Sequence, residues 1–154
     1  MTIMQHNIEI ARAPEQVLAY ASSASRWPEW HPSSLKVDAI NGPLPAGSHF
    51  EEDIHAGGRP GHLSWDVIEY IPGQRWQARA KDDSKGLHLV LTYECRATAG
   101  GTQFIRTLDY GFSGVLMRIL NHLILRRRID RESAESLRIL RTMAEQVLAP
   151  ESRH

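Results

Sequence analysis

The fold is decided by the sequence GVLMRILNHLILRRRIDRESAESLRILRTMAEQVL, which occupies residues 114–148. After Gly114 this stretch contains neither glycine nor proline, the two residues that most often interrupt a helix. Its apolar residues recur at helical spacing and fall near one stripe, which comprises Leu116, Ile119, Leu120, Leu123, Ala134, Leu137, Leu140, Ala144 and Val147. The pattern predicts one long C-terminal helix that buries this stripe.

The residues before this helix alternate between apolar and polar, as strands with one buried face do. The alternation is clearest after Gly47, where Ser48, Phe50, Glu52 and Ile54 share one face and the opposite face is wholly polar. Later segments repeat the pattern, and their predicted inner residues are Leu63, Trp65 and Val67; Trp76, Ala78 and Ala80; Leu87, Leu89, Leu91, Tyr93 and Cys95; and Phe104, Arg106, Leu108 and Tyr110.

Together these patterns predict an α+β fold in which the C-terminal helix covers a curved antiparallel sheet of about seven strands. Two short helices are expected after the first strand, one beginning at Pro14 and one within residues 25–32, followed by a brief strand over Leu35–Ile40. A single domain is expected over residues 1–149, with residues 150–154 as a frayed tail. Such a sheet and helix enclose a cavity, which is where function is to be sought.

Composition excludes several classes of protein. The chain of 154 residues carries 18 Lys and Arg against 18 Asp and Glu, so it lacks the basic excess typical of nucleic-acid binders. The single cysteine, Cys95, cannot form an internal disulfide, and no secretion signal or long apolar run is present. A cytoplasmic protein with no transmembrane segment is therefore expected. No phosphate loop, nucleophile elbow or metal motif is present, so no cofactor is expected.

Several short motifs occur in a characteristic order along the chain. They are IEIARAPEQV at 8–17, WPEWHP at 27–32, GPLPAGSHF at 42–50, VIEYIPG at 67–73, Gly101-Thr102 before a strand, and LRILR at 137–141. In order and spacing they resemble the polyketide cyclase/dehydrase-like branch of the START-like superfamily, which also contains the Bet v 1 allergens. The resemblance covers nearly the whole chain.

This resemblance implies a helix-grip fold with a hydrophobic ligand cavity between the sheet and the last helix. It does not imply a reaction, because the superfamily includes lipid carriers, hormone receptors, aromatase/cyclases and oxygenase subunits. The site therefore has to be sought among the individual residues.

Two charged residues, Glu52 and Arg106, fall on predicted inner faces. A buried carboxylate without a partner is costly and tends to take up a proton instead. One interpretation is that both residues line the cavity, where they orient a polar part of a ligand or pair with each other. The alternative is that they lie at strand ends and reach solvent, or that Arg106 pairs with Asp130 on the last helix.

Aromatic and histidine side chains provide further candidates for ligand contact. Trp30 and His31 lie on the short segment expected to form one lip of the cavity, whereas Trp27 is interpreted as a core residue. The inner-face residues Phe50, Trp65, Tyr93 and Tyr110 are candidate ligand contacts, although such residues often serve only as core. His6 is expected at the mouth or edge of the sheet.

Two surface features admit more than one interpretation. His49, Glu51, Asp53 and His55 alternate along one strand, but parallel side chains on one strand cannot all converge on one ion, so a solvated face is expected. The segment Val115–Arg131 is apolar and then basic, which suits a membrane surface, a lid or a homodimer contact as well as a core-facing helix.

The sequence thus supports three hypotheses. The first is a protein that binds a small hydrophobic molecule, lipid-like, aromatic or polyketide-like, under the C-terminal helix. The second is a polyketide cyclase or dehydratase that uses acid and base groups of the cavity. The third is a module that docks on a membrane or partner through Val115–Arg131.

Overall fold

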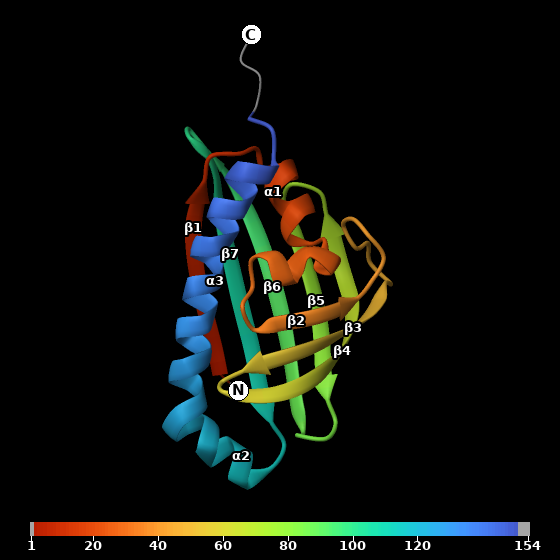
Figure 1. Ribbon diagram of the computed structural model, residues 1–154, viewed down its shortest axis with the longest axis vertical. Helices are drawn as coiled ribbons and strands as arrows, with labels where there is room; N and C mark the ends of the chain where they lie inside the picture. The colour runs from red at the N-terminus through yellow and green to blue at the C-terminus, as the bar shows by residue number, and fades with distance from the viewer. Residues whose placement is uncertain (1, 151–154) are drawn as a thin grey trace.

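The computed structural model describes residues 2–150, which form a seven-stranded antiparallel sheet and one long C-terminal helical segment (Figure 1). In chain order the elements are β1 (Thr2–Ile10), α1 (Pro14–Ala21), the 3-10 helix η1 (Ala24–Glu29), β2 (Ser34–Asp38), β3 (His49–Ala56), β4 (Arg59–Ile71), β5 (Arg75–Asp82), β6 (Leu87–Thr98), β7 (Gly101–Phe112), α2 (Val115–Leu120), the π-helical turn η2 (Asn121–Leu125) and α3 (Arg126–Val147). The strands are ordered β1-β7-β6-β5-β4-β3-β2.

The predicted helix-grip architecture is confirmed. Helix α3 runs along the side of the sheet that β1 and β7 form (Figure 1). Helices α1 and η1 cover the upper part of the sheet, and strands β2 to β4 curve round from the side of the sheet opposite α3. The first strand pairs with the last along its whole length, from Thr2 opposite Tyr110 to Ile10 opposite Thr102. The first and last strands of the chain, β1 and β7, are therefore neighbours in the sheet, and α3 packs against β1.

Alternation places the inner faces of the strands as the sequence predicted. On β7, Phe104, Arg106, Leu108 and Tyr110 are all buried, and on β3 both Phe50 and Glu52 are buried. Period-two geometry makes this outcome robust, because a slip of one residue would expose the whole apolar set.

The upper half of the core is built from aromatic rings. We call Trp27, Phe50, Trp65, Trp76 and Tyr93 the aromatic cluster. Trp27 meets Phe50 and Trp65 edge-on at 5.4 Å, and Phe50 stacks on Trp65 at 5.6 Å. Trp76 stacks on Tyr93 at 5.3 Å and donates its indole N–H to the Leu44 carbonyl at 3.0 Å. These contacts fasten η1 to the sheet and leave the upper half densely filled.

The C-terminal helix departs from its predicted stripe over its first ten residues. Leu116, Ile119 and Leu123 were expected to be buried, but 78%, 52% and 65% of their surfaces are exposed. Residues that face inward there are Asn121 and Leu125, with Met117 and Leu120 half-buried. The prediction was wrong because it applied one helical period across the π turn, which changes the direction in which successive side chains point.

Further along, α3 follows the expected stripe more closely. Leu137, Leu140 and Ala144 are buried, whereas Val147 is 42% exposed at the helix end. Ser133 and Ser136 are also buried against the sheet, which the apolar pattern did not indicate.

A β-hairpin tip reaches across to α3. The turn between β3 and β4 contains Gly57 and Gly58, whose φ angles of +61° and +80° suit the left-handed conformations of a tight hairpin turn. The Gly57 N–H donates to both carboxylate oxygens of Glu132, each at 3.1 Å. This contact ties the hairpin tip to the helix and closes one side of the cavity described below.

Other expectations differ only in detail. The brief strand expected over Leu35–Ile40 is Ser34–Asp38, and Ile40 is exposed. The expected frayed tail, residues 150–154, lies outside the described residues except for Pro150. None of the helices described between residues 2 and 150 has both the length and the apolar character needed to cross a membrane.

Candidate functional site

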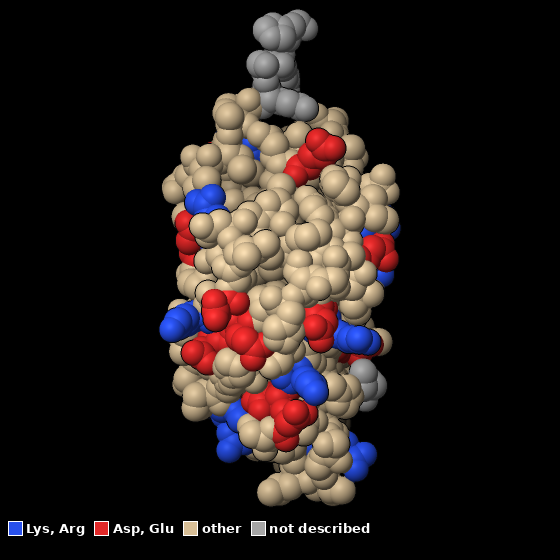
Figure 2. Space-filling model, turned by 90° about the vertical axis from the view of Figure 1, so that its right-hand side faces the viewer, with Lys and Arg blue, Asp and Glu red and all other residues tan. Residues whose placement is uncertain are grey.

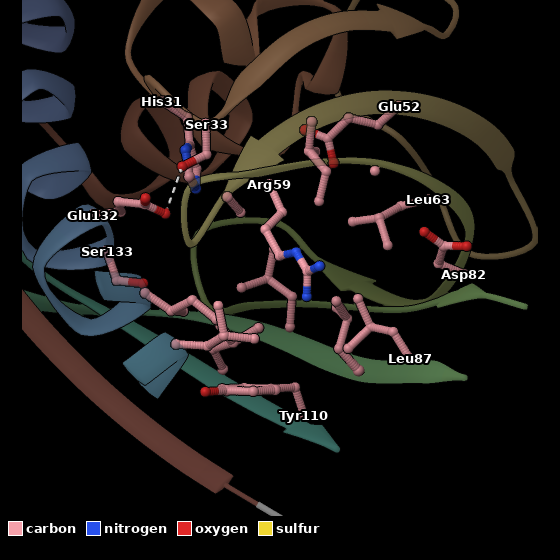
Figure 3. Close-up of a pocket in the computed structure, with 18 of the residues that line it drawn as sticks. His31, Ser33, Glu52, Arg59, Leu63, Asp82, Leu87, Tyr110, Glu132 and Ser133 are labelled. Atoms are coloured by element: carbon pink, nitrogen blue, oxygen red, sulfur yellow. Dashed lines mark hydrogen bonds between the residues drawn. The ribbon is translucent and has the colours of Figure 1, made fainter. Parts of the chain in front are cut away.

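A cavity of about 120 Å³ lies below the aromatic cluster, between the lower half of the sheet and the helical segment (Figure 3). Its apolar walls come from strands β3, β4, β6 and β7 and from the helical segment, and consist mainly of Ile54, Leu63, Leu87, Leu89, Leu91, Leu108, Phe112, Leu125 and Ile129. About 10–15 Å³ is enough for one water molecule, and a cavity near 150 Å³ accepts benzene. The space therefore suits a small apolar ligand.

Glu52 forms a polar point on the β3 side of the cavity. Its side chain is 4% exposed, and its Oε1 accepts the Trp65 indole N–H at 3.0 Å. Burial raises the pKa of Glu52 to about 7, against the opposing effects of hydrogen bonds and of the Arg106 charge. Near neutral pH the Glu52 carboxyl is therefore present in both its protonated form, which can donate a proton, and its ionised form, which can accept one.

Arg106 forms a second polar point on β7, where it is 5% exposed. Its Nη1 donates to the Ser133 hydroxyl at 2.8 Å, and its Nη2 lies 3.3 Å from His31 Nε2. The predicted alternative, a pair with Asp130, is wrong, because Asp130 lies 3.0 Å from His6 Nε2 instead. Both partners of the guanidinium are thus uncharged groups.

His31 stays neutral beside Arg106. Burial of the ring, and then the neighbouring guanidinium charge, lower the pKa of His31 to about 3. Because a guanidinium can only donate, Nε2 of His31 must accept, which assigns the ring proton to Nδ1. His31 is therefore a fixed neutral donor and acceptor rather than a titrating group at neutral pH.

The two tyrosines of the cavity differ in their partners. The Tyr110 hydroxyl donates to Asn121 Oδ1 at 2.5 Å, and the Asn121 amide donates to Thr2 at 3.1 Å, so this tyrosine anchors the π turn. The Tyr93 hydroxyl is buried close to Arg106 without a hydrogen bond of good geometry. Burial raises the pKa of Tyr93 well above its ordinary value, so the phenol stays protonated.

Of the eight predicted ligand contacts, the structure brings six to the cavity wall: His31, Glu52, Trp65, Tyr93, Arg106 and Tyr110. Trp30 and Phe50 are fully buried and lie behind this wall, where Phe50 stacks on Trp65 and the Trp30 ring lies 5.7 Å from that of His31. Trp27, interpreted from sequence as core, is core and also reaches the cavity. Cys95 is a free, buried thiol whose pKa burial raises to about 12.

Sequence reasoning missed the polar residues that the helix and the segment after η1 contribute. Ser33 and Glu132 line the cavity and are joined by a hydrogen bond of 3.1 Å, which Figure 3 shows as a dashed line. Ser133, which holds Arg106, lies four residues before Leu137 on the buried stripe, so its position could have been found from helical spacing. Nothing in the sequence indicates the long-range contact between Ser33 and Glu132.

The β3–β4 hairpin and α2 each contribute a flexible side chain to the lining of the cavity. Arg59 extends from the hairpin, with Nη1 3.7 Å from Met117 Sδ, and its guanidinium lies among the lining side chains in Figure 3. Arg59 is exposed and Met117 is only half-buried. A ligand larger than one ring therefore requires these two flexible side chains to move apart.

The outer face of β3 and β4 carries a network of ionisable groups. His62 contacts Asp53 at 2.7 Å and Glu51 at 3.0 Å, and His49 contacts Glu51 at 2.6 Å. Across residues 2–150, no three His, Cys, Asp or Glu side chains are grouped so that they could hold a metal ion. Figure 2 shows acidic and basic side chains interspersed over one face, with uncharged atoms at the lower tip, where α2 lies in Figure 1.

Comparison with known proteins identifies the family. A family model described as polyketide cyclase/dehydrase and lipid transport matches residues 1–145. The chain therefore belongs to this family, as the sequence motifs predicted. No curated protein matches the chain at a significant level.

Solved structures share the fold at low sequence identity. The Zhui aromatase/cyclase from Streptomyces sp. R1128 is 14% identical over 94% of each chain, with a TM-score of 0.77. TTHA0849 from Thermus thermophilus is 12% identical over 96% of this chain and 100% of its own, with a TM-score of 0.80. The di-domain aromatase/cyclase StfQ of the steffimycin pathway is 18% identical over 94% of this chain and 51% of its own, with a TM-score of 0.74. At these identities the likeness shows the fold alone.

Proposed function

We propose that the protein binds a small, largely apolar molecule in the cavity between the sheet and the C-terminal helical segment. The observation that carries this proposal is a hollow of about 120 Å³ walled mainly by leucines, with the buried polar side chains of Glu52 and Arg106 in its wall. Ligand sites typically combine apolar walls with a few polar groups that fix orientation. The family's description, which includes lipid transport, also supports this class of function.

A thermal-shift measurement with toluene tests the proposal. A ligand that binds only the folded state raises Tm, and Tm should rise further as its concentration increases. Leu108→Trp, which fills the cavity, should abolish the increase, whereas Leu35→Trp on an exposed position of β2 should preserve it. A folded wild-type protein whose Tm does not respond to saturating toluene would contradict the proposal. Native mass spectrometry of the purified protein would reveal a molecule already bound.

A second candidate function is a cyclase or dehydratase activity, which the Glu52 pKa of about 7 favours. In an intramolecular aldol step, the Glu52 carboxylate would remove a proton from the carbon beside a carbonyl, while Arg106 stabilises the enolate oxygen. The enolate carbon would form a bond to a second carbonyl carbon, and Glu52 would return the proton to the new alkoxide. A later elimination would release water.

This enzymatic candidate ranks second because a polyketide-length chain exceeds the present cavity unless Arg59 and Met117 separate. The variants Glu52→Gln, Arg106→Ala and Tyr110→Phe distinguish turnover from binding. Loss of turnover in Glu52→Gln with retained binding would support catalysis. Unchanged turnover in all three variants would remove this mechanism.

A further inference from the structure

The guanidinium of Arg106 is buried and, within the part of the chain that the structure describes, has no carboxylate in contact with it. Its two hydrogen-bonding partners are the Ser133 hydroxyl and the neutral imidazole of His31. Among the ion pairs of residues 2–150, none includes Arg106. A buried charge of this kind is costly unless an opposite charge or a full set of acceptors compensates it.

The acidic residues nearest to this region are engaged elsewhere. Glu52 accepts from Trp65, and burial keeps it partly protonated near neutral pH. Glu132 accepts from the Gly57 N–H and the Ser33 hydroxyl. Asp130 contacts His6. The protein itself therefore supplies no carboxylate in contact with Arg106.

Buried polar atoms without partners gather around the same guanidinium. They are Arg106 Nε and the Tyr93 hydroxyl. Tyr93 and Arg106 are directly opposite each other on β6 and β7, and His31 lies against Arg106 from the segment just after η1. Arg106 Nε can only donate, and the protonated Tyr93 hydroxyl has a hydrogen to donate. Unfilled donors beside a buried cation suit an acceptor that carries negative charge.

We propose that this end of the cavity binds the carboxylate of a small organic acid whose remaining part, a ring or a short aliphatic chain, occupies the leucine-lined space. Arg106 supplies the charge, and the Tyr93 hydroxyl supplies a neutral donor beside it. The Ser133 hydroxyl holds the guanidinium at Nη1. This inference rests on the proposed function, since it names the class of ligand that the same cavity takes.

The test compares benzoate with benzamide, which has nearly the same size and shape but no charge, in NMR titrations at pH 7.5. Wild-type protein should bind benzoate at least about 30-fold more tightly than benzamide. Arg106→Met should bring this ratio close to one. Arg96→Met, which removes an exposed arginine from β6, should leave the ratio unchanged.

The outcomes separate this inference from the proposed function. If toluene raises Tm but benzoate and benzamide bind equally to the wild-type protein, the carboxylate site is overturned and the apolar cavity stands. If none of the three probes binds, the proposed function itself fails. Should Arg106→Met not fold, the wild-type ratio still decides, and Tyr93→Phe should weaken benzoate but not benzamide. Displacement of benzoate by inorganic phosphate at equal concentration would overturn the requirement for an apolar body.

Discussion

The two halves of the core are built from different residues and serve different purposes. Above, the aromatic cluster packs rings edge-to-face and face-to-face at 5.3–6.0 Å around Trp27 and Trp76. Below, leucines from the sheet and the helical segment surround a hollow of about 120 Å³. The same sheet supplies both halves, so the difference between them lies in their side chains and in the helical segments that cover them.

The comparison shows how one small domain combines a rigid support with a space for a ligand. Large rings fill the upper half and fix η1, and the segment just after η1 places His31 at the cavity. Aliphatic side chains below are shorter, and the helical segment that covers them is displaced outward at α2 (Figure 1). Breaking either half by substitution should therefore have effects of different kind and size.

The largest expected effect is in the aromatic cluster. Trp76→Ala removes a fully buried ring and leaves the Leu44 carbonyl without its indole donor. We expect the free energy of unfolding to fall by about 3–5 kcal/mol in urea denaturation. A loss below about 1 kcal/mol would show that the upper half is not the rigid support inferred here.

The next effect concerns the pH dependence that Glu52 imposes. A carboxyl whose pKa is raised in the folded state binds its proton more tightly there than in the unfolded chain, so stability falls as pH rises from about 4.5 through 7. The free energy of unfolding of Glu52→Gln, relative to that of the wild type, should therefore rise by about 3 kcal/mol between pH 4 and pH 8. Urea denaturation across this pH range measures the difference.

Glu9→Gln provides the matched control, because Glu9 is exposed on β1. Its pH dependence should follow that of the wild type. Parallel curves for Glu52→Gln and the wild type would mean that Glu52 titrates as an ordinary surface carboxyl.

A smaller effect is expected from enlarging the hollow. Leu108→Ala should lower the free energy of unfolding by about 2 kcal/mol, the lower end of the range for buried leucines, because part of the side chain already faces empty space. The same variant should accept a larger ring than toluene, such as naphthalene, as a Tm increase would show. A loss as large as that of Trp76→Ala would contradict the contrast between the halves.

The smallest effect is on the outer face of the sheet. Hydrogen bonds to Asp53 and then Glu51 raise the pKa of His62, so its contribution is present at low pH and lost as pH rises through that raised value. His62→Gln should therefore destabilise the protein at pH 5.5 by less than about 1 kcal/mol, since the pair is solvent-exposed, and have no effect at pH 9. An effect at pH 9 would point to packing instead of charge.

Much of this architecture was predictable because strand periodicity is unambiguous. Alternation placed Glu52 and Arg106 on inner faces, and both are buried there. The start of the helical segment was not predictable, because every residue of Val115–Leu125 is compatible with a helix and nothing in their order marks the π turn at Asn121–Leu125.

The candidate site was predictable only where it depends on a single strand. The remaining polar groups of the cavity depend on contacts between distant segments. Ser33 and Glu132, which bond to each other, are 99 residues apart, and Ser133 is 27 residues from its partner Arg106. Local patterns carry no information about such contacts, and charge alone suggested the wrong partner, Asp130, for Arg106.

The most direct test of the hollow lower half is a toluene titration followed by methyl NMR of leucine-labelled protein. We predict that the methyl resonances of the cavity leucines shift saturably; these residues are Leu89, Leu91, Leu108 and Leu125. The methyl resonances of buried leucines in the upper half and in α3 should change little; these residues are Leu18, Leu44 and Leu140. Shifts confined to the exposed residues Leu116 and Leu123, or no saturable shift at all, would contradict this prediction.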